Sequence, residues 1–501
     1  MADQDRLNFG GEGFGGGLAL PVRSNFKLIH RNYGKTLVRI GGQYFPRRTL
    51  TLALWESFLI VASLLTATAL RFHHFSSIRD FLSQPHNWYR FLVVTLVCQL
   101  ALYYNDLYDL RTTRSRSVLL VRSLRALGTA FLALAFLYYC FPPLVLGRGI
   151  ALLATPLAVT LMLAWRLAAG ANNTFSRPIE RVLILGTGNS AAGLAREILN
   201  RPELQYKIVG FLDEKGENIG MPMVNPGIIG GISQLEEIVD RECIDRVVIS
   251  LGERRGVLPF RAMAALKLQG LPIEDGQSVY ERLTGRIMLQ HLRPSWLILS
   301  DGFNKSGLLL AGKRAIDIMV STVLIALTLP LMLAIAVSIL LESGSPILFR
   351  QERIGLGGRA FQILKFRSMR QGSEKGRPRW TADGDPRITR LGRLIRKFRL
   401  DELPQLLNIL RGEMSLVGPR PEVPYFCELL EKEIPFFNQR HVVRPGLTGW
   451  AQVKYQYGAT LEESKTKFEF DLFYIKHLSL FLDLAIIFET AKVVLWGRGA
   501  K

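Results

Sequence analysis

The chain has 501 residues, enough for two or three domains, and 49% of the residues are hydrophobic. It carries 63 basic and 42 acidic residues, and the net charge of +21 indicates a polyanionic partner or an anionic membrane surface. Its four cysteines (Cys98, Cys140, Cys243 and Cys427) have no Cys-x-x-Cys spacing, which argues against a zinc site and against a disulfide framework.

Residues 1–48 are predicted to be a flexible basic tail, because they are rich in glycine and lack the apolar core and cleavage site of a signal peptide. Residues 49–170 contain four apolar runs, at 50–70, 91–104, 118–141 and 150–169. About 20 helical residues cross a bilayer core, and aromatic side chains extend the short second run. We therefore predict four transmembrane helices. The alternative is a set of buried helices in a large soluble domain.

The loops between these runs differ in their arginine content. Three arginines closely precede the first run, three lie between the second and third, and one lies between the third and fourth: Arg39, Arg47, Arg48; Arg111, Arg114, Arg116; and Arg148. The positive-inside rule places arginine-rich loops in the cytoplasm. We therefore expect the N-terminus and everything after residue 169 to be cytoplasmic.

Residues 177–300 alternate between short apolar strands and helices, which predicts a Rossmann-like parallel sheet with strands at 182–185, 207–212 and 246–251. Gly186 and Gly188 follow the first strand and can bring backbone N–H groups close to a phosphate. Asp213 ends the second strand, where an acid can bind a ribose. The pattern therefore indicates a weak nucleotide site. A regulatory or dimerising module without a nucleotide is equally compatible with it.

Residues 301–312 are predicted to be a linker, and an apolar run at 316–341 follows, interrupted by Pro330. The run is long enough to span a bilayer, but spanning would place the following basic domain outside the cell. Proline can bend a helix sharply. We therefore expect residues 313–345 to form a re-entrant hairpin that is broken at Pro330. A kinked transmembrane span is the alternative.

Residues 388–399 combine bases with apolar residues at helical spacing, which predicts an amphipathic helix on the membrane surface. A solvated basic face is the alternative. Nucleic-acid binding is not expected, because no nucleic-acid motif is present. The apolar run at 478–496 could complete a membrane-surface platform.

Asp401 is predicted to lie at or near the start of a helix that runs to Leu410, and Glu402 follows it. Helix N–H groups and nearby arginines are expected to lower the pKa of Asp401 and leave it ionised as a nucleophile. Glu402 points about 100° away around the helix and could hold Mg²⁺ that bridges phosphate oxygens. An N-capping aspartate followed by a surface glutamate is the alternative.

Residues 313–501 resemble the bacterial polyprenyl-phosphate hexose-1-phosphate transferases, also called monotopic phosphoglycosyl transferases. The resemblance rests on Lys-Arg at 313–314 before the proline-containing run, KFRSM at 365–369, LDELPQ at 400–405, GEMSLVGPRP at 412–421 and RPGLTGW at 444–450. The N-terminal helices and the Rossmann-like module are similar to the large form of the family. Members often carry serine before the hairpin proline, whereas this chain has Leu329.

The resemblance implies a reaction and roles for residues. Asp401 would attack the β-phosphorus of a UDP-sugar, release UMP and form a covalent phosphosugar intermediate, from which undecaprenyl phosphate takes the sugar phosphate. Glu402 would hold Mg²⁺. The residues implied in substrate and phosphate binding are Lys365, Arg367, Arg387, Arg420, Arg444 and Asp471.

The family further implies a place in the cell and a pathway. The transferred group would be glucose-1-phosphate, slightly preferred over galactose-1-phosphate, and the product would start an exopolysaccharide, a capsule or an O-antigen. We expect a homodimer in the bacterial inner membrane. Two other functions stay open. The first, a membrane-bound NAD-dependent sugar-nucleotide dehydratase or epimerase, is disfavoured because no tyrosine between 177 and 300 is followed four residues later by lysine. The second is a non-catalytic scaffold for polysaccharide assembly.

Overall fold

The computed structural model describes residues 37–40, 43–72, 74–109, 116–171, 180–201, 204–251, 258–289, 300–370, 385–455 and 460–495. Residues 1–36 of the predicted tail lie outside these ranges. The rest of that prediction is wrong, because β1 (Leu37–Ile40) and β2 (Gln43–Pro46) pair as an antiparallel hairpin and α1 begins at Arg47.

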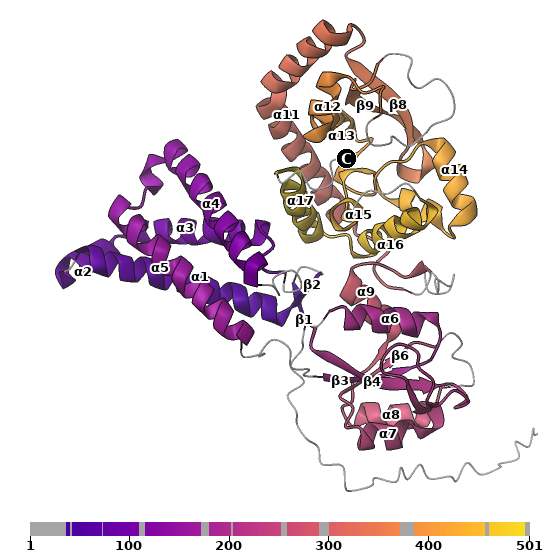
Figure 1. Ribbon diagram of the computed structural model, residues 1–501. Helices are drawn as coiled ribbons and strands as arrows, with labels where there is room; N and C mark the ends of the chain where they lie inside the picture. The colour runs from indigo at the N-terminus through magenta and orange to yellow at the C-terminus, as the bar shows by residue number, and fades with distance from the viewer. Residues whose placement is uncertain are drawn as a thin grey trace, which may run out of the picture. The chain divides into compact units, whose positions relative to one another are not determined.

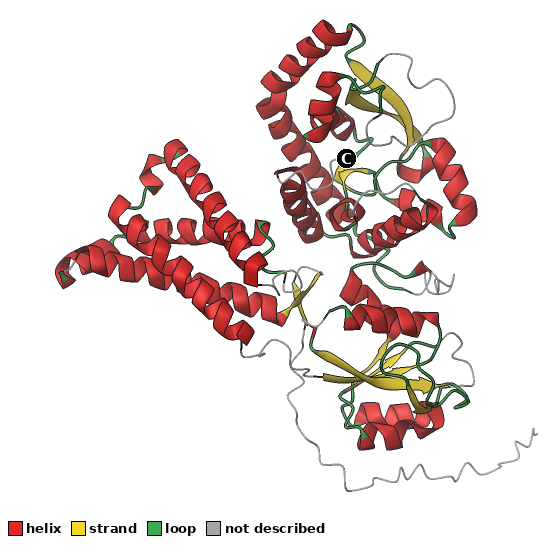
Figure 2. Cartoon of the chain, in the orientation of Figure 1, coloured by secondary structure: helices red, strands yellow, loops and turns green. Residues whose placement is uncertain are grey.

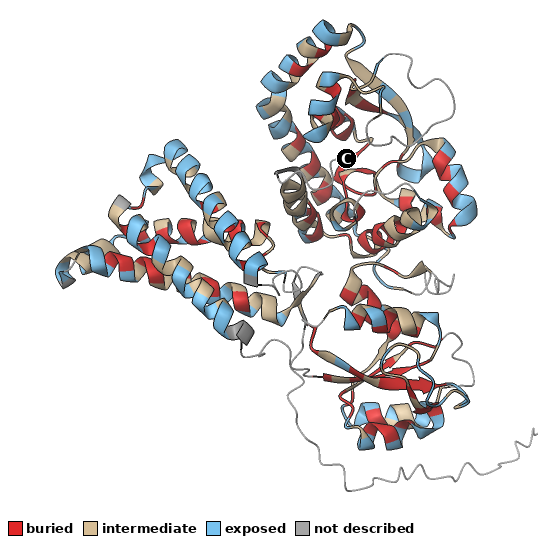
Figure 3. Cartoon of the chain, viewed as in Figure 1, coloured by how far each residue is buried: buried red, intermediate tan, exposed pale blue. Residues whose placement is uncertain are grey.

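The helical part contains α1 (Arg47–Phe72), α2 (Phe75–Ser83), α3 (Pro85–Tyr104), α4 (Arg116–Cys140) and α5 (Arg148–Ala171), shown in Figures 1 and 2. Among the described helices, α1, α4, α5 and the later α11 are long and apolar enough to cross a membrane; α3 is shorter and less apolar. Much of the ribbon of these helices is coloured as exposed in Figure 3. The exposed residues include the large apolar Leu54, Phe131 and Leu152, with 71%, 70% and 76% of their surface exposed. Such surfaces suit a lipid environment.

A five-stranded parallel sheet forms the centre of the next part of the chain. Its order is β5-β4-β3-β6-β7, and the strands are β3 (Glu180–Leu185), β4 (Tyr206–Asp213), β5 (Ile228–Gly231), β6 (Arg246–Ile249) and β7 (Ile273–Asp275). Helices α6 (Asn189–Leu199) and α9 (Gly276–Thr284) cover one face, and α7 (Leu235–Arg241) and α8 (Phe260–Leu268) cover the other. The prediction of a parallel sheet is therefore confirmed.

The remaining part, which we call the catalytic domain, is mostly helical and contains two small sheets. Its helices are α11 (Gly307–Ser343), α12 (Arg390–Lys397), α13 (Gln405–Arg411), α14 (Pro424–Glu433), α15 (Trp450–Lys454), α16 (Leu461–His477) and α17 (Leu480–Leu495). Strands β8 (Leu348–Ile354) and β9 (Ala360–Phe366) pair antiparallel, and β10 (Ser415–Val417) and β11 (Gly446–Thr448) pair parallel. One core cluster joins α13, α14, α16 and α17.

The apolar helix α11 differs from its prediction at its start. It begins at Gly307, where the Ser306 hydroxyl accepts a hydrogen bond from the Leu309 N–H at 3.3 Å, so the predicted linker 301–312 is too long. It also continues through Pro330 as a single helix that bends along its length (Figure 1), and the re-entrant hairpin stays a prediction. Neighbouring groups can compensate for the hydrogen bond that proline removes within an apolar helix.

Both ends of α11 pack against the catalytic domain. Lys313 and Asp317 are buried near its start, and Ile335 and Ile339 are buried near its end. Between them the helix exposes apolar side chains such as Leu327, which is 72% exposed (Figure 3).

The basic helix α12 covers residues 390–397 only and divides its apolar residues between two environments. Ile395 is buried and packs against Ile335, Ile339 and Phe366. Leu394 and Phe398 are 54% and 48% exposed. The predicted membrane-seeking face is therefore narrower than its sequence pattern indicates, because part of it belongs to the core.

Candidate active site

Asp401 and Glu402 lie in a short 3₁₀ helix, η7 (Leu400–Glu402), which follows α12. Arg399 has a left-handed backbone (φ +54°) and turns the chain inward, so both acids are buried, each with only 9% exposed. The α-helix α13 begins after Pro404, at Gln405. Asp401 therefore lies one turn before this α-helix, near its start as predicted.

Glu402 is surrounded by three cations. Its Oε1 atom lies 2.8 Å from Arg420, 3.5 Å from Lys365 and 4.0 Å from Arg399. Burial opposes ionisation of this carboxyl, but the three cations outweigh it and hold the pKa of Glu402 well below its usual range. Glu402 is therefore a permanent anion at the centre of a basic cluster.

Asp401 has a different environment. No donor among the described residues makes a hydrogen bond or an ion pair with its carboxylate, while burial and the neighbouring Glu402 charge raise its pKa. The charges of Lys365, Arg396 and Arg420 act in the opposite direction but do not prevail. The predicted lowering of the Asp401 pKa is therefore wrong, because the nearby cations form their ion pairs with Glu402. What remains is a buried carboxylate with no partner among the residues that the structure describes.

A chain of contacts positions Arg420. Arg440 donates from one nitrogen to the Arg420 carbonyl at 2.8 Å and to Asp471 Oδ2 at 3.0 Å. Burial raises the pKa of Asp471 to about 6, although the Arg440 charge opposes this. Arg420, Arg440 and Asp471 line one cavity with Phe437. Asp471 is therefore connected to Glu402 by a chain of contacts through Arg440 and Arg420.

The loop that carries Arg420 depends on two glycines. A Cβ on Gly418 would lie 2.3 Å from the Arg444 carbonyl, and a Cβ on Gly446 would lie 2.1 Å from the Gly418 nitrogen. These contacts are shorter than van der Waals distance, so the two backbone segments approach this closely only without side chains. The GPRP and RPG motifs are therefore neighbours in space.

Helix α11 is tied to the same loop by a buried polar cluster. Lys313 donates to the Val417 carbonyl at 2.9 Å and to Asp483 at 2.7 Å, and Asp317 accepts from the Leu416 N–H at 3.0 Å. Since β10 leads directly into Gly418, these contacts fix the apolar helix relative to Arg420.

Other predicted site residues have structural partners. Arg367 donates to the Ser343 and Gly344 carbonyls at 2.8 and 2.6 Å and caps the end of α11. Arg387 pairs with Asp385 at 2.6 Å and lowers the pKa of that carboxyl to about 2. Arg444 donates to the Gly412 carbonyl at 3.0 Å. The structure thus groups Lys365 and Arg420 with the acids and gives these three arginines other contacts.

Sequence reasoning misses Arg399 and Arg440. Arg399 stands three residues before Glu402, a spacing that could have indicated the pair. Arg440 has no local signal, because its partners Arg420 and Asp471 are 20 and 31 residues away.

The predicted nucleotide site has internal partners as well. Gly186 has φ +116°, and a Cβ there would lie 2.5 Å from the Ser250 carbonyl, so packing against the end of β6 already requires glycine. Gly188 caps α6. Asp213 accepts from the Thr187 hydroxyl at 2.9 Å and from the Glu217 N–H at 3.1 Å. Nucleotide binding at these residues stays a prediction.

Magnesium would have few protein ligands here. The described residues contain no group of three or more His, Cys, Asp or Glu side chains placed to hold a metal. Glu402 offers its second carboxylate oxygen, and Asp401 adjoins it. Mg²⁺ is commonly bound by one or two carboxylates together with water and substrate phosphates, so this donor set fits it.

Comparisons with known proteins agree with this arrangement. Residues 309–497 match the family model described as bacterial sugar transferase, and residues 104–256 match one described as a CoA-binding domain. A UDP-glucose:undecaprenyl-phosphate glucose-1-phosphate transferase of Xanthomonas campestris pv. campestris is 33% identical over 344 residues, which are 64% of this chain and 68% of the relative. This chain belongs to the bacterial sugar transferases.

Two further relatives of this sugar transferase carry different sugar names. An Aeromonas hydrophila protein, named UDP-N-acetylgalactosamine-undecaprenyl-phosphate N-acetylgalactosaminephosphotransferase, is 45% identical over 48% of this chain and 56% of its own length. A Komagataeibacter xylinus undecaprenyl-phosphate glucose phosphotransferase is 33% identical over 65% of this chain and 61% of its own length. The chain therefore spans less than two thirds of either relative. Its apolar helices and its bacterial relatives make it a bacterial membrane protein.

Proposed function

We propose that this sugar transferase moves a hexose-1-phosphate from a UDP-sugar to undecaprenyl phosphate, releases UMP and so starts a surface polysaccharide. The observation that carries the proposal is the contrast between the two buried acids. Asp401 has no partner among the described residues, whereas three cations hold Glu402. A carboxylate of the first kind suits nucleophilic attack, and one of the second kind suits the organisation of phosphates.

The proposed reaction has two displacements at one phosphorus. An Asp401 oxygen forms a bond to the β-phosphorus, and the bond to the bridging oxygen breaks, so that its electron pair leaves with UMP. An oxygen of undecaprenyl phosphate then attacks the same phosphorus, and the bond to Asp401 breaks, which restores the carboxylate. The acceptor becomes undecaprenyl diphosphate sugar, and no redox partner is needed.

The basic cluster would lower the cost of bringing anions together. The leaving UMP and the entering lipid phosphate both carry negative charge, and positioned cations stabilise such charge most where water is excluded. Arg420, Lys365 and Arg399 are the groups in place for this. Bound at Glu402, Mg²⁺ would add neutralising charge on the phosphate oxygens.

The apolar helix α11 would bring this site to the membrane surface. We propose that it enters the inner leaflet and returns, which keeps the catalytic domain and the parallel-sheet module in the cytoplasm. The contacts of both helix ends with one domain support this proposal, as does the exposed apolar middle. The exposed Leu394 and Phe398 on α12 would lie against the same surface.

Cysteine labelling tests this topology. Ala311→Cys and Glu352→Cys place exposed thiols in the first turns of α11 and beyond its end, and both are expected to react with an impermeant maleimide only from the cytoplasmic side. The native exposed Cys140 and Cys243 serve as controls for the opposite and the same side. Labelling at position 352 from the periplasm would mean that α11 spans the bilayer.

The sugar is the least constrained part of the proposal. The family resemblance favours glucose, with galactose next, and the relatives' names include both glucose and N-acetylgalactosamine. We retain glucose as the first candidate. The homodimer also stays a prediction.

A UMP-release assay tests the function directly. The full chain in lipid nanodiscs is mixed with undecaprenyl phosphate, Mg²⁺ and one of UDP-glucose, UDP-galactose or UDP-N-acetylgalactosamine. We expect UMP and lipid-linked sugar in equal amounts with at least one donor. Their absence with every UDP-hexose would contradict the proposal and would favour a scaffold.

A further inference from the structure

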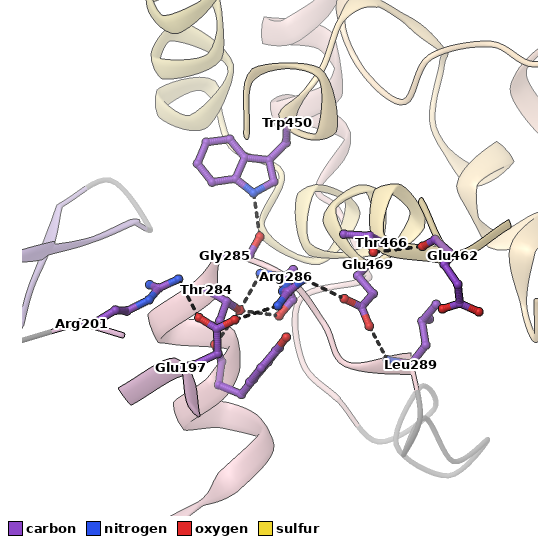
Figure 4. A network of polar contacts seen from close by, with 11 residues as sticks. Glu197, Arg201, Thr284, Gly285, Arg286, Leu289, Trp450, Glu462, Thr466 and Glu469 are labelled. Carbon is purple, nitrogen blue, oxygen red and sulfur yellow. Dashed lines mark hydrogen bonds and ion pairs between the residues drawn. The ribbon is translucent and has the colours of Figure 1, made fainter. Parts of the chain in front are cut away.

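Residues 285–289, at the end of the parallel-sheet module, contact the catalytic domain, and we call them the docking segment (Figure 4). Ile287 is fully buried and belongs to the core cluster of the catalytic domain, whereas Met288 packs against the core of the module. The Gly285 carbonyl accepts from the Trp450 indole N–H at 2.7 Å. The docking segment therefore contributes a side chain to the core of each domain.

The docking segment meets helix α16 chiefly at Glu469. The Ile287 N–H donates to the Glu469 carbonyl at 3.1 Å, and the Leu289 N–H donates to its carboxylate at 3.2 Å. Arg286 lies between two acids, 2.9 Å from Glu197 on α6 and 3.6 Å from Glu469 (Figure 4). One arginine thus links the module to α16.

A second contact holds the end of the same helix. Glu281 on α9 is buried, accepts from Lys476 at 2.8 Å and also contacts His477. Burial opposes ionisation of Glu281, but hydrogen bonds and charge from His477 and Lys476 prevail and lower its pKa. Helix α16 is therefore fixed to the module at two points.

Only one residue separates Glu469 from Asp471, which begins the chain of contacts to the active site. Asp471 holds Arg440, Arg440 holds the Arg420 carbonyl, and the Arg420 side chain pairs with Glu402. Every step is a charge-assisted or backbone hydrogen bond between buried or half-buried groups, and such bonds have narrow geometry. A shift of α16 would therefore move Arg420.

We infer that Arg286 and Glu469 are positioning residues for the phosphate-binding Arg420, acting through α16. The inference rests on the proposed function, since it assigns the module a part in that reaction. The contact of the module with α16 would then help to set the position of the Arg420 side chain beside Glu402.

Turnover of the full chain tests this inference. Arg286→Gln is expected to lower kcat for UMP release about 5-fold, a size typical of coupling between distant sites, with KM for the UDP-sugar unchanged. Arg286→Lys keeps the charge and is expected to recover most of the loss. The matched control is Arg282→Gln, since Arg282 pairs with Glu274 inside the module and is expected to leave turnover unchanged. Wild-type turnover in Arg286→Gln would overturn the inference.

Combining variants separates positioning from simple stability. Asp471→Asn weakens the contact between Asp471 and Arg440. Adding Arg286→Gln to this variant is expected to reduce its kcat further by less than about 2-fold, because both substitutions act on one chain of contacts. Independent, multiplying losses would overturn the inference. So would a loss of turnover that tracks a lower melting temperature.

Hydrogen exchange without substrate gives a readout that needs no activity. Arg286→Gln is expected to speed amide exchange in peptides covering 415–423 and 437–443, whereas Arg282→Gln does not. Unchanged exchange in both peptides would overturn the inference even if the enzyme is active. If the wild-type chain releases no UMP while Arg286→Gln still speeds amide exchange in both peptides, only the proposed function would be contradicted.

Discussion

Asp401→Asn is expected to abolish UMP release, with turnover reduced by at least about 10⁴-fold, as is typical when a covalent nucleophile is removed. The amide has nearly the same shape as the carboxylate but does not form the acyl phosphate. Because Asp401 has no partner among the described residues and its pKa is raised by burial, replacing it with a neutral group breaks no ion pair. The variant should therefore fold with an unchanged or higher melting temperature.

Two companion variants make this result specific. Asp401→Ala excludes slow deamidation of the asparagine as a source of residual activity. Asp301→Asn, at an exposed turn of the same domain, should retain wild-type turnover. Turnover of Asp401→Asn within a few fold of wild type would contradict its role as nucleophile.

Glu402→Gln is expected to lower turnover about 100-fold and to raise the Mg²⁺ concentration needed for half-maximal activity, in line with the loss of one well-placed charge in a metal or oxyanion site. The substitution removes the anion shared by Arg420, Lys365 and Arg399. Their mutual repulsion is then uncompensated, so Arg420 loses its orientation. Unlike Asp401→Asn, this variant should also lower the melting temperature, since it breaks a buried ion pair.

The charge can be restored in part. Glu402→Asp keeps the carboxylate and is expected to recover stability more than turnover, because the shorter side chain does not reach the same oxygen positions. Glu352→Gln is a matched control, as Glu352 is exposed on β8 of the same domain. If Glu402→Gln kept the wild-type dependence on Mg²⁺, the proposed metal role of Glu402 would be wrong.

The sequence could predict that Asp401, Glu402, Lys365 and Arg420 lie close together, because each stands in a short local motif. The acids are adjacent, and Lys365 and Arg420 stand in short patterns that resemble a known family. Arg367 stands in such a pattern too, yet it caps α11, because a motif does not say which way a side chain points. Arg440 could not be predicted, since only the folded chain brings it between Arg420 and Asp471.

The pKa of Asp401 shows a second limit. Many arginines nearby suggest a lowered pKa, but charge near an acid is not the same as a contact with it. Glu402 collects the three ion pairs, and burial then decides the direction for Asp401. The sequence does not reveal which of two neighbouring acids forms the ion pairs with the cations around them.

The elements of the fold followed from periodicity more readily than their ends. Strands β3 and β4 lie where alternating and apolar runs predicted them, and the parallel sheet was confirmed. The hairpin at 37–46 was missed, because two four-residue strands leave little periodicity to detect. Pro330 does not end the helical assignment of α11, because an apolar helix can continue through a proline.

The covalent adduct is the central claim, and peptide mass analysis measures it. Purified enzyme is mixed with UDP-glucose or another accepted donor without undecaprenyl phosphate, quenched rapidly, digested and analysed for the peptide that contains residue 401. We expect the mass of one hexose phosphate on Asp401, lost again when undecaprenyl phosphate is added before quenching. An enzyme that releases UMP and transfers sugar, yet never carries this adduct on Asp401, would contradict the account.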